Sequence, residues 1–468
     1  MPERRSQLLL DEFIGLLGGL RGAFSQDRLF VRVCRQAIGV LCALGVRTVA
    51  RVLAATGRDQ CDWSTEYRLF SRSPWKSREI FRPILKAALQ QCPAKGPIVL
   101  AGDFTHLPKS GKHTPGVTCM RDPMSPPFHT NLIYGLRFFQ VTVLCSFLER
   151  KPEPLPARSI PVRFEASPVV SKPGKRATQE DLAKYKQAVK QKLSSNAARQ
   201  TLVDLREDFD AAGAEGRDLL VTLDGSFCSR VFFGKPLERI KLLVRCRKDA
   251  VLCKQAEEGS KCFYDKKIFT PEGVRQDESI EWNKEPFFIG GNFHPIRFKE
   301  IKNVLWRRGG QRRPLRLIVI APTGYRLHAK GALLYRQPAY LLTDDLETPI
   351  EKLIAAYLDH WQIEINHREE KDTMGVGNAQ VRNENSVPRQ PAFVVAIYSI
   401  LLLAALRAYG PERTEDYLPP PKWGRPSKRP SCLEIIALLR HQVVAHPEKL
   451  VDFEIETSAL TLVLKAAA

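Results

Sequence analysis

The sequence lacks several patterns that would assign it to a familiar class of protein. Its 11 cysteines form no Cys-x-x-Cys pair, which argues against a zinc ribbon or zinc finger. Their odd number and scattered positions are typical of reduced thiols in a cytosolic protein. No signal-peptide pattern opens the chain. The one long apolar run, residues 392–406, is shorter than the roughly 18 residues that a membrane-spanning helix needs, so we expect a buried core helix there.

Acidic residues are too few to balance the basic ones. The chain has 72 lysines and arginines against 51 aspartates and glutamates, which gives a net charge of +21. Such an excess predicts a polyanionic partner, most commonly nucleic acid; a basic protein without such a partner is the alternative. At 468 residues, 44% hydrophobic and 26% charged, the chain is expected to be a soluble protein of two or three domains.

The first 92 residues carry apolar side chains at helical spacing, with glycine-containing breaks between the runs. Residues 47–57 and 64–70 resemble a helix, a turn and a second helix. Arginines and lysines that could contact phosphates lie in or just after the second helix: Arg68, Arg72, Lys76 and Arg78. The alternative is a helical packing or dimerisation domain with arginines on its surface.

Short apolar runs after residue 97 predict strands, and two of them end in an aspartate. Residues 97–103 end in Asp103, and residues 218–224 end in Asp224. The other elements expected from the pattern are strands at 131–148 and 240–245, a polar amphipathic helix at 179–212 and a β-rich insert at 254–345 without helices. The expected class is therefore α/β.

The stretch 357–371 gathers polar groups on one face of a predicted helix. They recur at intervals of three, four and seven residues: Tyr357, His360, Glu364 and Lys371. At 3.6 residues per turn these intervals return to nearly the same face, with Trp361 beside it. A face with a phenol, an imidazole, a carboxylate and an ammonium indicates a polar partner.

Glu364 could join Asp103 and Asp224 at one metal site. A helical glutamate packed over a sheet that ends two strands in aspartates gathers three carboxylates. Mg²⁺ prefers oxygen ligands and retains waters, so two or three carboxylates with phosphate oxygens suffice to bind it. Two such ions about 4 Å apart support phosphoryl transfer. Taken singly, each acid is weak evidence for a metal site, because a strand-end aspartate is more often a cap or turn residue.

These three acids and the 357–371 face resemble bacterial insertion-sequence transposases of the DDE superfamily, in the cut-and-paste group with a Tyr-(2)-Arg-(3)-Glu-(6)-Lys signature. Tyr357, Glu364 and Lys371 match that spacing, and His360 stands where the signature has arginine. Supporting blocks surround the other acids: GDFT at 102–105, TLDGS at 222–226 and LVRCRKDA at 243–250. The likeness covers roughly residues 97–440.

The resemblance implies a ribonuclease H-like mixed sheet flanked by helices, with a β-rich insert and an all-α N-terminal domain. It implies that Asp103, Asp224 and Glu364 are catalytic and bind two Mg²⁺ ions, for which Mn²⁺ can substitute. Tyr357 and Lys371 would contact phosphates of the transferred DNA end. The implied partners are DNA (terminal inverted repeats and target) and a second copy of the chain, in the bacterial cytoplasm at the nucleoid.

His360 is the departure from the signature. A guanidinium grips phosphate bidentately and is always charged, whereas a neutral imidazole does neither. His360 could still hydrogen-bond a phosphate, with weaker end binding. Histidine at this position could be a feature of a subgroup of the family, or it could mark an inactivated copy of the element; both interpretations are open.

Further DNA contacts are predicted in two basic segments. Lys109 and Lys112 flank Gly111 in a loop after the first acid; the alternative is a solvated basic loop. The most basic patch of the chain lies in the insert, and its candidates are Trp306, Arg307, Arg308, Arg312 and Arg313. Trp306 could stack on an unpaired base, although packing within the insert is its commoner role.

The expected organisation has five segments: a helical DNA-binding domain at 1–92, the first part of the catalytic core at 93–253, the insert at 254–345, the second part of the core with the glutamate helix at 346–410, and a C-terminal basic loop and helical region at 411–468. The expected function is DNA cutting at mobile-element ends followed by strand transfer. The alternatives are a catalytically impaired DNA-binding regulator of transposition and a metal-dependent nuclease that does not join strands.

Overall fold

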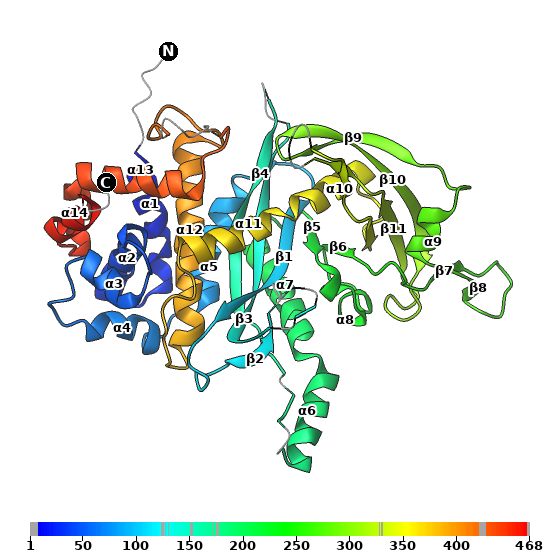
Figure 1. The fold of residues 1–468 in the computed structure, drawn as a ribbon, viewed down its shortest axis with the longest axis horizontal. Helices are drawn as coiled ribbons and strands as arrows, with labels where there is room; N and C mark the ends of the chain where they lie inside the picture. The colour runs from blue at the N-terminus through cyan, green and yellow to red at the C-terminus, as the bar shows by residue number, and fades with distance from the viewer. Residues whose placement is uncertain are drawn as a thin grey trace.

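The computed structural model describes most of the chain. The described residues are 8–122, 126, 128–129, 131–149, 153–170, 172–174, 177–326, 328, 331–420 and 427–465. Helices lie at one end of the molecule, a large sheet lies in the middle, and the insert strands lie at the other end (Figure 1).

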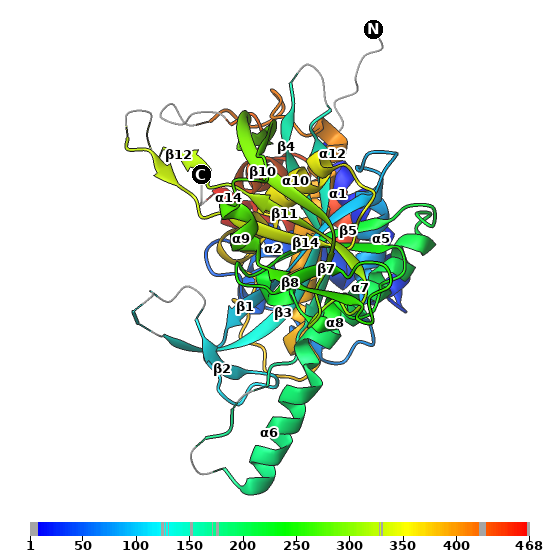
Figure 2. The same ribbon diagram turned by 90° about the vertical axis from the view of Figure 1, so that its right-hand side faces the viewer.

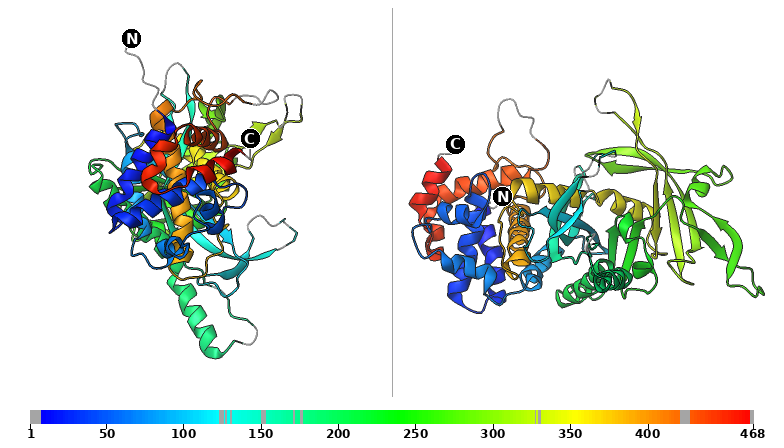
Figure 3. Two further views of the ribbon diagram at one scale, coloured as in Figure 1. Left: turned by 90° about the vertical axis from the view of Figure 1, so that its left-hand side faces the viewer. Right: turned by 60° about the horizontal axis from the view of Figure 1, so that its bottom comes forward.

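The helical end combines N-terminal and C-terminal segments. Its helices are α1 (Leu9–Gly18), α2 (Asp27–Cys42), α3 (Val49–Ala55), α4 (Ser64–Ser71), α5 (Ser77–Leu89), α12 (Ser386–Tyr409), α13 (Cys432–Ala445) and α14 (Thr457–Lys465). The expected helical character of the first 92 residues is therefore confirmed. These N-terminal helices bury their apolar faces in one hydrophobic cluster with α12 and α13 (Figure 3).

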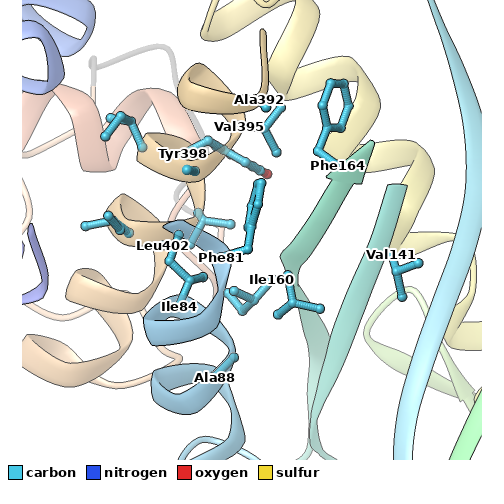
Figure 4. Packing of buried hydrophobic residues seen from close by; sticks show 14 of the residues in the cluster. Phe81, Ile84, Ala88, Val141, Ile160, Phe164, Ala392, Val395, Tyr398 and Leu402 are labelled. Carbon is cyan, nitrogen blue, oxygen red and sulfur yellow. The ribbon is translucent and has the colours of Figure 1, made fainter. Parts of the chain in front are cut away.

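Helix α12 is the centre of this layer. The expected core helix is confirmed, but it starts at Ser386 and has 24 residues, so it is longer than the apolar run at 392–406. Among the described residues it is the one helix long and apolar enough to cross a membrane, and 83% of its most apolar window is buried in the protein. In Figure 4, Phe81 of α5 and Val395 of α12 pack toward Ile160 and Phe164 of a sheet strand.

The middle of the molecule is a mixed sheet. Its described strands are β1 (Ile98–Pro108), β2 (Thr118–Arg121), β3 (Leu132–Phe147), β4 (Leu155–Ala166), β5 (Leu219–Leu223), β6 (Ile240–Arg245), β7 (Leu252–Gln255), β8 (Tyr264–Phe269), β9 (Asn283–Ile289), β10 (Asn292–Leu305), β11 (Pro314–Ile320) and β14 (Ala339–Thr343). They run in the order β2-β3-β1-β5-β6-β14-β11-β10-β7-β8, with β4 on β3 and β9 on β10. Strands β1, β5 and β6 are parallel neighbours, and the other pairs are antiparallel. The mixed α/β, ribonuclease H-like fold class is confirmed.

The insert continues this sheet. Strand β14 pairs with β6 on one side and with β11 on the other, so the insert strands extend the same hydrogen-bonded ladder. A two-stranded hairpin, β12 (Gly324–Tyr325) with β13 (Leu334–Tyr335), projects from it (Figure 2). The expectation that the insert lacks helices is wrong, because α9 (Pro271–Gln276) starts there with Thr270 as its cap and Pro271 at its first position. The five segment boundaries remain predictions.

The polar helix expected at 179–212 is divided into α6 (Gln179–Gln191) and α7 (Leu193–Ala211). The break is at Lys192, whose φ of 48° is left-handed and cannot continue a helix. Helix α6 has no buried residue and projects from the body (Figure 2), whereas α7 packs on the core through its apolar side chains.

Candidate active site

The parallel strands bring two of the predicted acids together. In the ladder, Gly102 of β1 is paired with Leu223 of β5, so the next residues, Asp103 and Asp224, stand side by side. Strand β1 does not end at Asp103 as expected. It continues to Pro108, because its second half pairs with β3 after β5 has ended.

The third acid comes from a helical segment that packs against the sheet strands. Helix α10 (Ile350–Asp359) is followed by α11 (Gln362–Arg368) and a π-helical turn at Glu369–Thr373. The single helix expected over 357–371 is therefore interrupted. At the first junction the amide of Glu364 donates to the carbonyl of Trp361, three residues back, at 3.1 Å. Lys371 lies in the π turn.

All three carboxylates line one cavity of about 290 Å³. The residues around it are Asp103, Leu223, Asp224, Arg245, Arg336, Tyr357, Leu358, His360, Trp361 and Glu364. Among the predicted site residues, the structure thus joins the three acids with Tyr357 and His360. The cavity is lined by both carboxylates and guanidinium groups, a combination suited to a phosphodiester held beside cations.

The carboxylates influence one another's charge. The pKa of Asp103 is raised to about 7, mainly by burial and further by the charges of Glu364 and Asp224. The amide of Phe104, which donates to Asp103 Oδ1 at 2.7 Å, opposes the rise. The Asp103 carboxyl is therefore partly protonated near pH 7, and a bound cation would favour its charged form.

The donor set fits a hard divalent cation. Three carboxylates offer only oxygen atoms, which Mg²⁺ and Mn²⁺ prefer, and both ions keep waters in their shell. Over the described part of the chain, no group of three or more His, Cys, Asp or Glu side chains is already arranged so that it could hold a metal ion. Cation binding here would therefore involve side-chain adjustment together with phosphate or water oxygens.

His360 joins the helical segment to the sheet. Its Nδ1 lies 2.9 Å from the Oγ1 of Thr222, two residues before Asp224 in the chain. Burial lowers the pKa of this imidazole, so the ring is neutral near pH 7. His360 is therefore a neutral ring with a hydrogen bond inside the protein, whereas the arginine of the signature would carry a positive charge at this position. Its contact with phosphate remains a prediction.

The charges of the acids affect the pKa values of both Tyr357 and Lys371. Burial raises the pKa of the Tyr357 phenol, with a further upward effect of Asp224 and a downward effect of Arg245. Burial lowers the pKa of the Lys371 ammonium, which the charges of Glu370, Glu364 and Asp103 partly restore. Tyr357 lines the cavity, whereas Lys371 does not.

Two arginines at the cavity were missed from the sequence. Arg245 ends β6, and Val244 is paired with Leu223, so Arg245 stands next to Asp224 at the edge of the parallel strands. Three parallel strand ends in a row were a signal that could have found it. Arg336 follows β13 of the projecting hairpin and carried no such signal, because only the folded chain brings it to the cavity.

The Lys109 ammonium is engaged within the protein, whereas the sequence predicted that it contacts a DNA phosphate. It is buried, and its Nζ donates to the carbonyls of Ala379 at 2.7 Å and Gly377 at 3.3 Å. Burial lowers its pKa to about 8. Lys112 is exposed, with its ammonium 5.2 Å from the ring centre of Tyr134.

Lys109→Met should destabilise the protein without weakening DNA binding. It leaves two buried carbonyls without their donor, which costs about 1–3 kcal/mol of unfolding free energy. Lys112→Met is the matched control and should leave urea denaturation unchanged. A salt-dependent loss of DNA affinity in Lys109→Met at unchanged stability would contradict the internal role.

No residue of the basic patch of the insert lines the carboxylate cavity. Trp306 packs edge-to-face on Phe233 at 5.9 Å, as expected for a packing residue. Arg313 donates to the carbonyl of Phe233 and pairs with Asp344 at 3.0 Å. Arg307 and Arg312 lie over the rings of Tyr264 and Phe263, and Arg308 is exposed. DNA contact by this patch stays a prediction.

The suspected DNA-contacting helices are α3 and α4, which are separated by a turn. Arg68, Arg72 and Lys76 are exposed there. Arg78 is turned inward and pairs with Asp208 of α7 at 2.9 Å, so it is engaged within the protein.

Comparison with known proteins agrees with this geometry. No curated protein matches the chain. A family model described as "DDE superfamily endonuclease" matches residues 32–313, which is more than half of the chain and includes Asp103 and Asp224. The match ends before Glu364, so the third carboxylate rests on its position at the cavity. The chain belongs to the DDE superfamily of endonucleases.

Proposed function

We propose that this protein is a transposase that cuts DNA at the ends of a bacterial insertion sequence and joins the freed 3′-hydroxyl to target DNA. The observation that carries the proposal is the meeting of Asp103, Asp224 and Glu364 at one cavity in a chain of the DDE superfamily. The match of Tyr357, Glu364 and Lys371 to the cut-and-paste signature supports the insertion-sequence assignment.

The three carboxylates would hold two Mg²⁺ or Mn²⁺ ions. When bound, such ions activate the attacking hydroxyl and offset charge on the leaving oxygen. The chain's own groups position the DNA: Arg245, Arg336 and Tyr357 line the cavity and can contact phosphate oxygens. DNA affinity is expected to fall steeply with salt, since phosphate contacts release counterions.

A cleavage assay tests the proposal. The substrate is linear DNA carrying the inverted repeats that flank the reading frame, with Mg²⁺ and a supercoiled target. Nicks at the repeat ends followed by products joined to the target are expected. Absence of any cutting with intact DNA binding would overturn the proposal.

Two narrower functions remain as outcomes of that assay. The family description names an endonuclease, which favours cutting without joining if no joined product forms. His360 in the place of arginine favours a DNA-binding regulator if the repeats are bound but not cut. A homodimer that holds both ends, and action at the nucleoid, are parts of the same proposal.

Cation binding should weaken as the pH falls below about 7. Asp103 has a pKa of about 7 and must lose its proton to become a ligand. Because the pKa of Asp103 is raised in the folded protein, the carboxyl keeps its proton at pH values below about 7 and releases it as the pH rises through that value. Affinity for Mn²⁺, followed by electron paramagnetic resonance, should rise up to about tenfold per pH unit below that pKa.

The matched control is Asp103→Asn, which should bind Mn²⁺ weakly with little dependence on pH across the same range. If wild-type affinity were constant between about pH 6 and about pH 8, the role of Asp103 as a cation ligand would be contradicted.

A further inference from the structure

The inward face of the glutamate helix is polar where an apolar face would be expected. Asn366 and His367 of α11 and Glu370 of the π turn all have buried side chains. Ile363 is the one buried apolar side chain of α11, in a small cluster with Ala101 of β1 and Leu144 of β3. Helix α10 before it packs on the sheet through apolar side chains, but from α11 to the π turn most of the buried side chains are polar.

A hydrogen bond between buried side chains joins the π turn after α11 to β3, the strand that pairs with β1, on which Asp103 lies. Gln140 of β3 is fully buried, and its Nε2 donates to Glu370 Oε1 at 2.8 Å. In the antiparallel ladder, Gln140 is the residue directly opposite Asp103. The Gln140–Glu370 hydrogen bond thus links the cross-strand partner of Asp103 to the turn that follows Glu364.

The π turn brings Glu370 to this partner. The amide of Met374 donates to the carbonyl of Glu369, five residues back, which is the hydrogen bond of a π turn. After the turn, the amide of Val376 donates to the carbonyl of Glu370; both bonds are 2.8 Å. The same turn carries Lys371, whose charge interacts with Glu364 and Asp103. On the other side, the hydroxyl of Tyr398 donates to Glu369 at 2.5 Å. Isolated π turns often occur at functional sites.

Stability alone does not account for this pair. Burial raises the pKa of Glu370 to about 8, so burying its charged form is unfavourable. The Oε1 of Gln140 is buried without a hydrogen-bond partner. Two apolar side chains of similar shape would stabilise the fold about as well. What they could not supply is a directional link that fixes the helix relative to the strand.

We infer that Gln140 and Glu370 are positioning residues that hold Glu364 against Asp103 in the geometry needed for DNA cutting. The inference rests on the proposed function and extends it to two residues outside the cavity. A displacement of the helix by about 1 Å can cost roughly 10²-fold in rate without loss of binding.

Three variants test the inference. Gln140→Leu removes the donor, and the double variant Gln140→Leu/Glu370→Leu replaces both partners by apolar groups. Both should lower kcat for DNA cutting by about 10- to 100-fold, with KM for DNA within about threefold of wild type. Glu370→Gln retains an acceptor for Gln140 and adds a donor for its free Oε1, so it should keep near-wild-type kcat.

The matched control is Gln442→Leu in α13. Gln442 is also buried, and its Oε1 accepts from the amide of Leu10 at 2.9 Å, far from the acids in the chain's helical layer. It should lower stability with kcat unchanged. Wild-type kcat in the double variant, or equal losses of kcat in Gln140→Leu and Gln442→Leu, would overturn the inference.

Hydrogen exchange separates failure of the inference from failure of the proposed function. If wild type does not cut DNA, the function fails, but the link is still measurable. Amides at 364–373 should then exchange at least about tenfold faster in Gln140→Leu than in Gln442→Leu. Equal exchange rates in that segment would overturn the link itself.

Discussion

Asp224→Asn is expected to abolish Mg²⁺-dependent DNA cutting, with a loss of at least about 10³-fold, while DNA binding and stability stay unchanged. The side chain follows β5 at the cavity, is exposed, and stands beside Asp103. The amide has nearly the same shape but no charge, so it removes a ligand for the cation without leaving a cavity. Cutting is followed on end-labelled repeat DNA, and binding by gel shift at fixed salt.

Asp249→Asn is the matched control for this change. Asp249 is also exposed and is paired with Arg247 at 2.6 Å, but it does not line the carboxylate cavity. It should cut DNA like wild type. Equal activity of Asp224→Asn and wild type would remove Asp224 from the catalytic set.

The largest expected effect on stability comes from Asp208→Ala. The Asp208 carboxylate is 3% exposed and pairs with the buried guanidinium of Arg163 in β4, with Arg78 at 2.9 Å and with Arg82 at 2.9 Å. These pairs tie α7 to α5 and the sheet. Truncation leaves the buried Arg163 with its longer pair to Glu165, at 3.4 Å, and removes the partner that Arg78 and Arg82 share. The loss should cost about 3–5 kcal/mol of unfolding free energy in urea denaturation.

Glu207→Gln on the same helix is the control. Its side chain is 65% exposed and also pairs with Arg78, at 2.8 Å. Because water screens this pair, its loss should cost under about 1 kcal/mol. Similar losses for Asp208→Ala and Glu207→Gln would show that the buried cluster does not anchor the layers.

The sequence alone determined the elements whose pattern is local. Helical spacing predicted the N-terminal helices and α12, and short apolar runs predicted β1, β5 and β6. Strand-end position and helical spacing also selected Asp103, Asp224 and Glu364, which the fold gathers at one cavity. The elements could be predicted because an apolar stripe or a short apolar run is a property of neighbouring residues.

The tertiary structure decided whatever depends on partners distant in the chain. Lys109 faces inward because it meets the carbonyls at 377–379, about which its own loop carries no information. Arg336 reaches the cavity only through the projecting hairpin, and Glu370 reaches Gln140 only through a π turn. The periodicity of the chain describes one element at a time. Which side chains meet across elements is set by sheet order and packing, so the acids were visible in the sequence and the groups that position them were not.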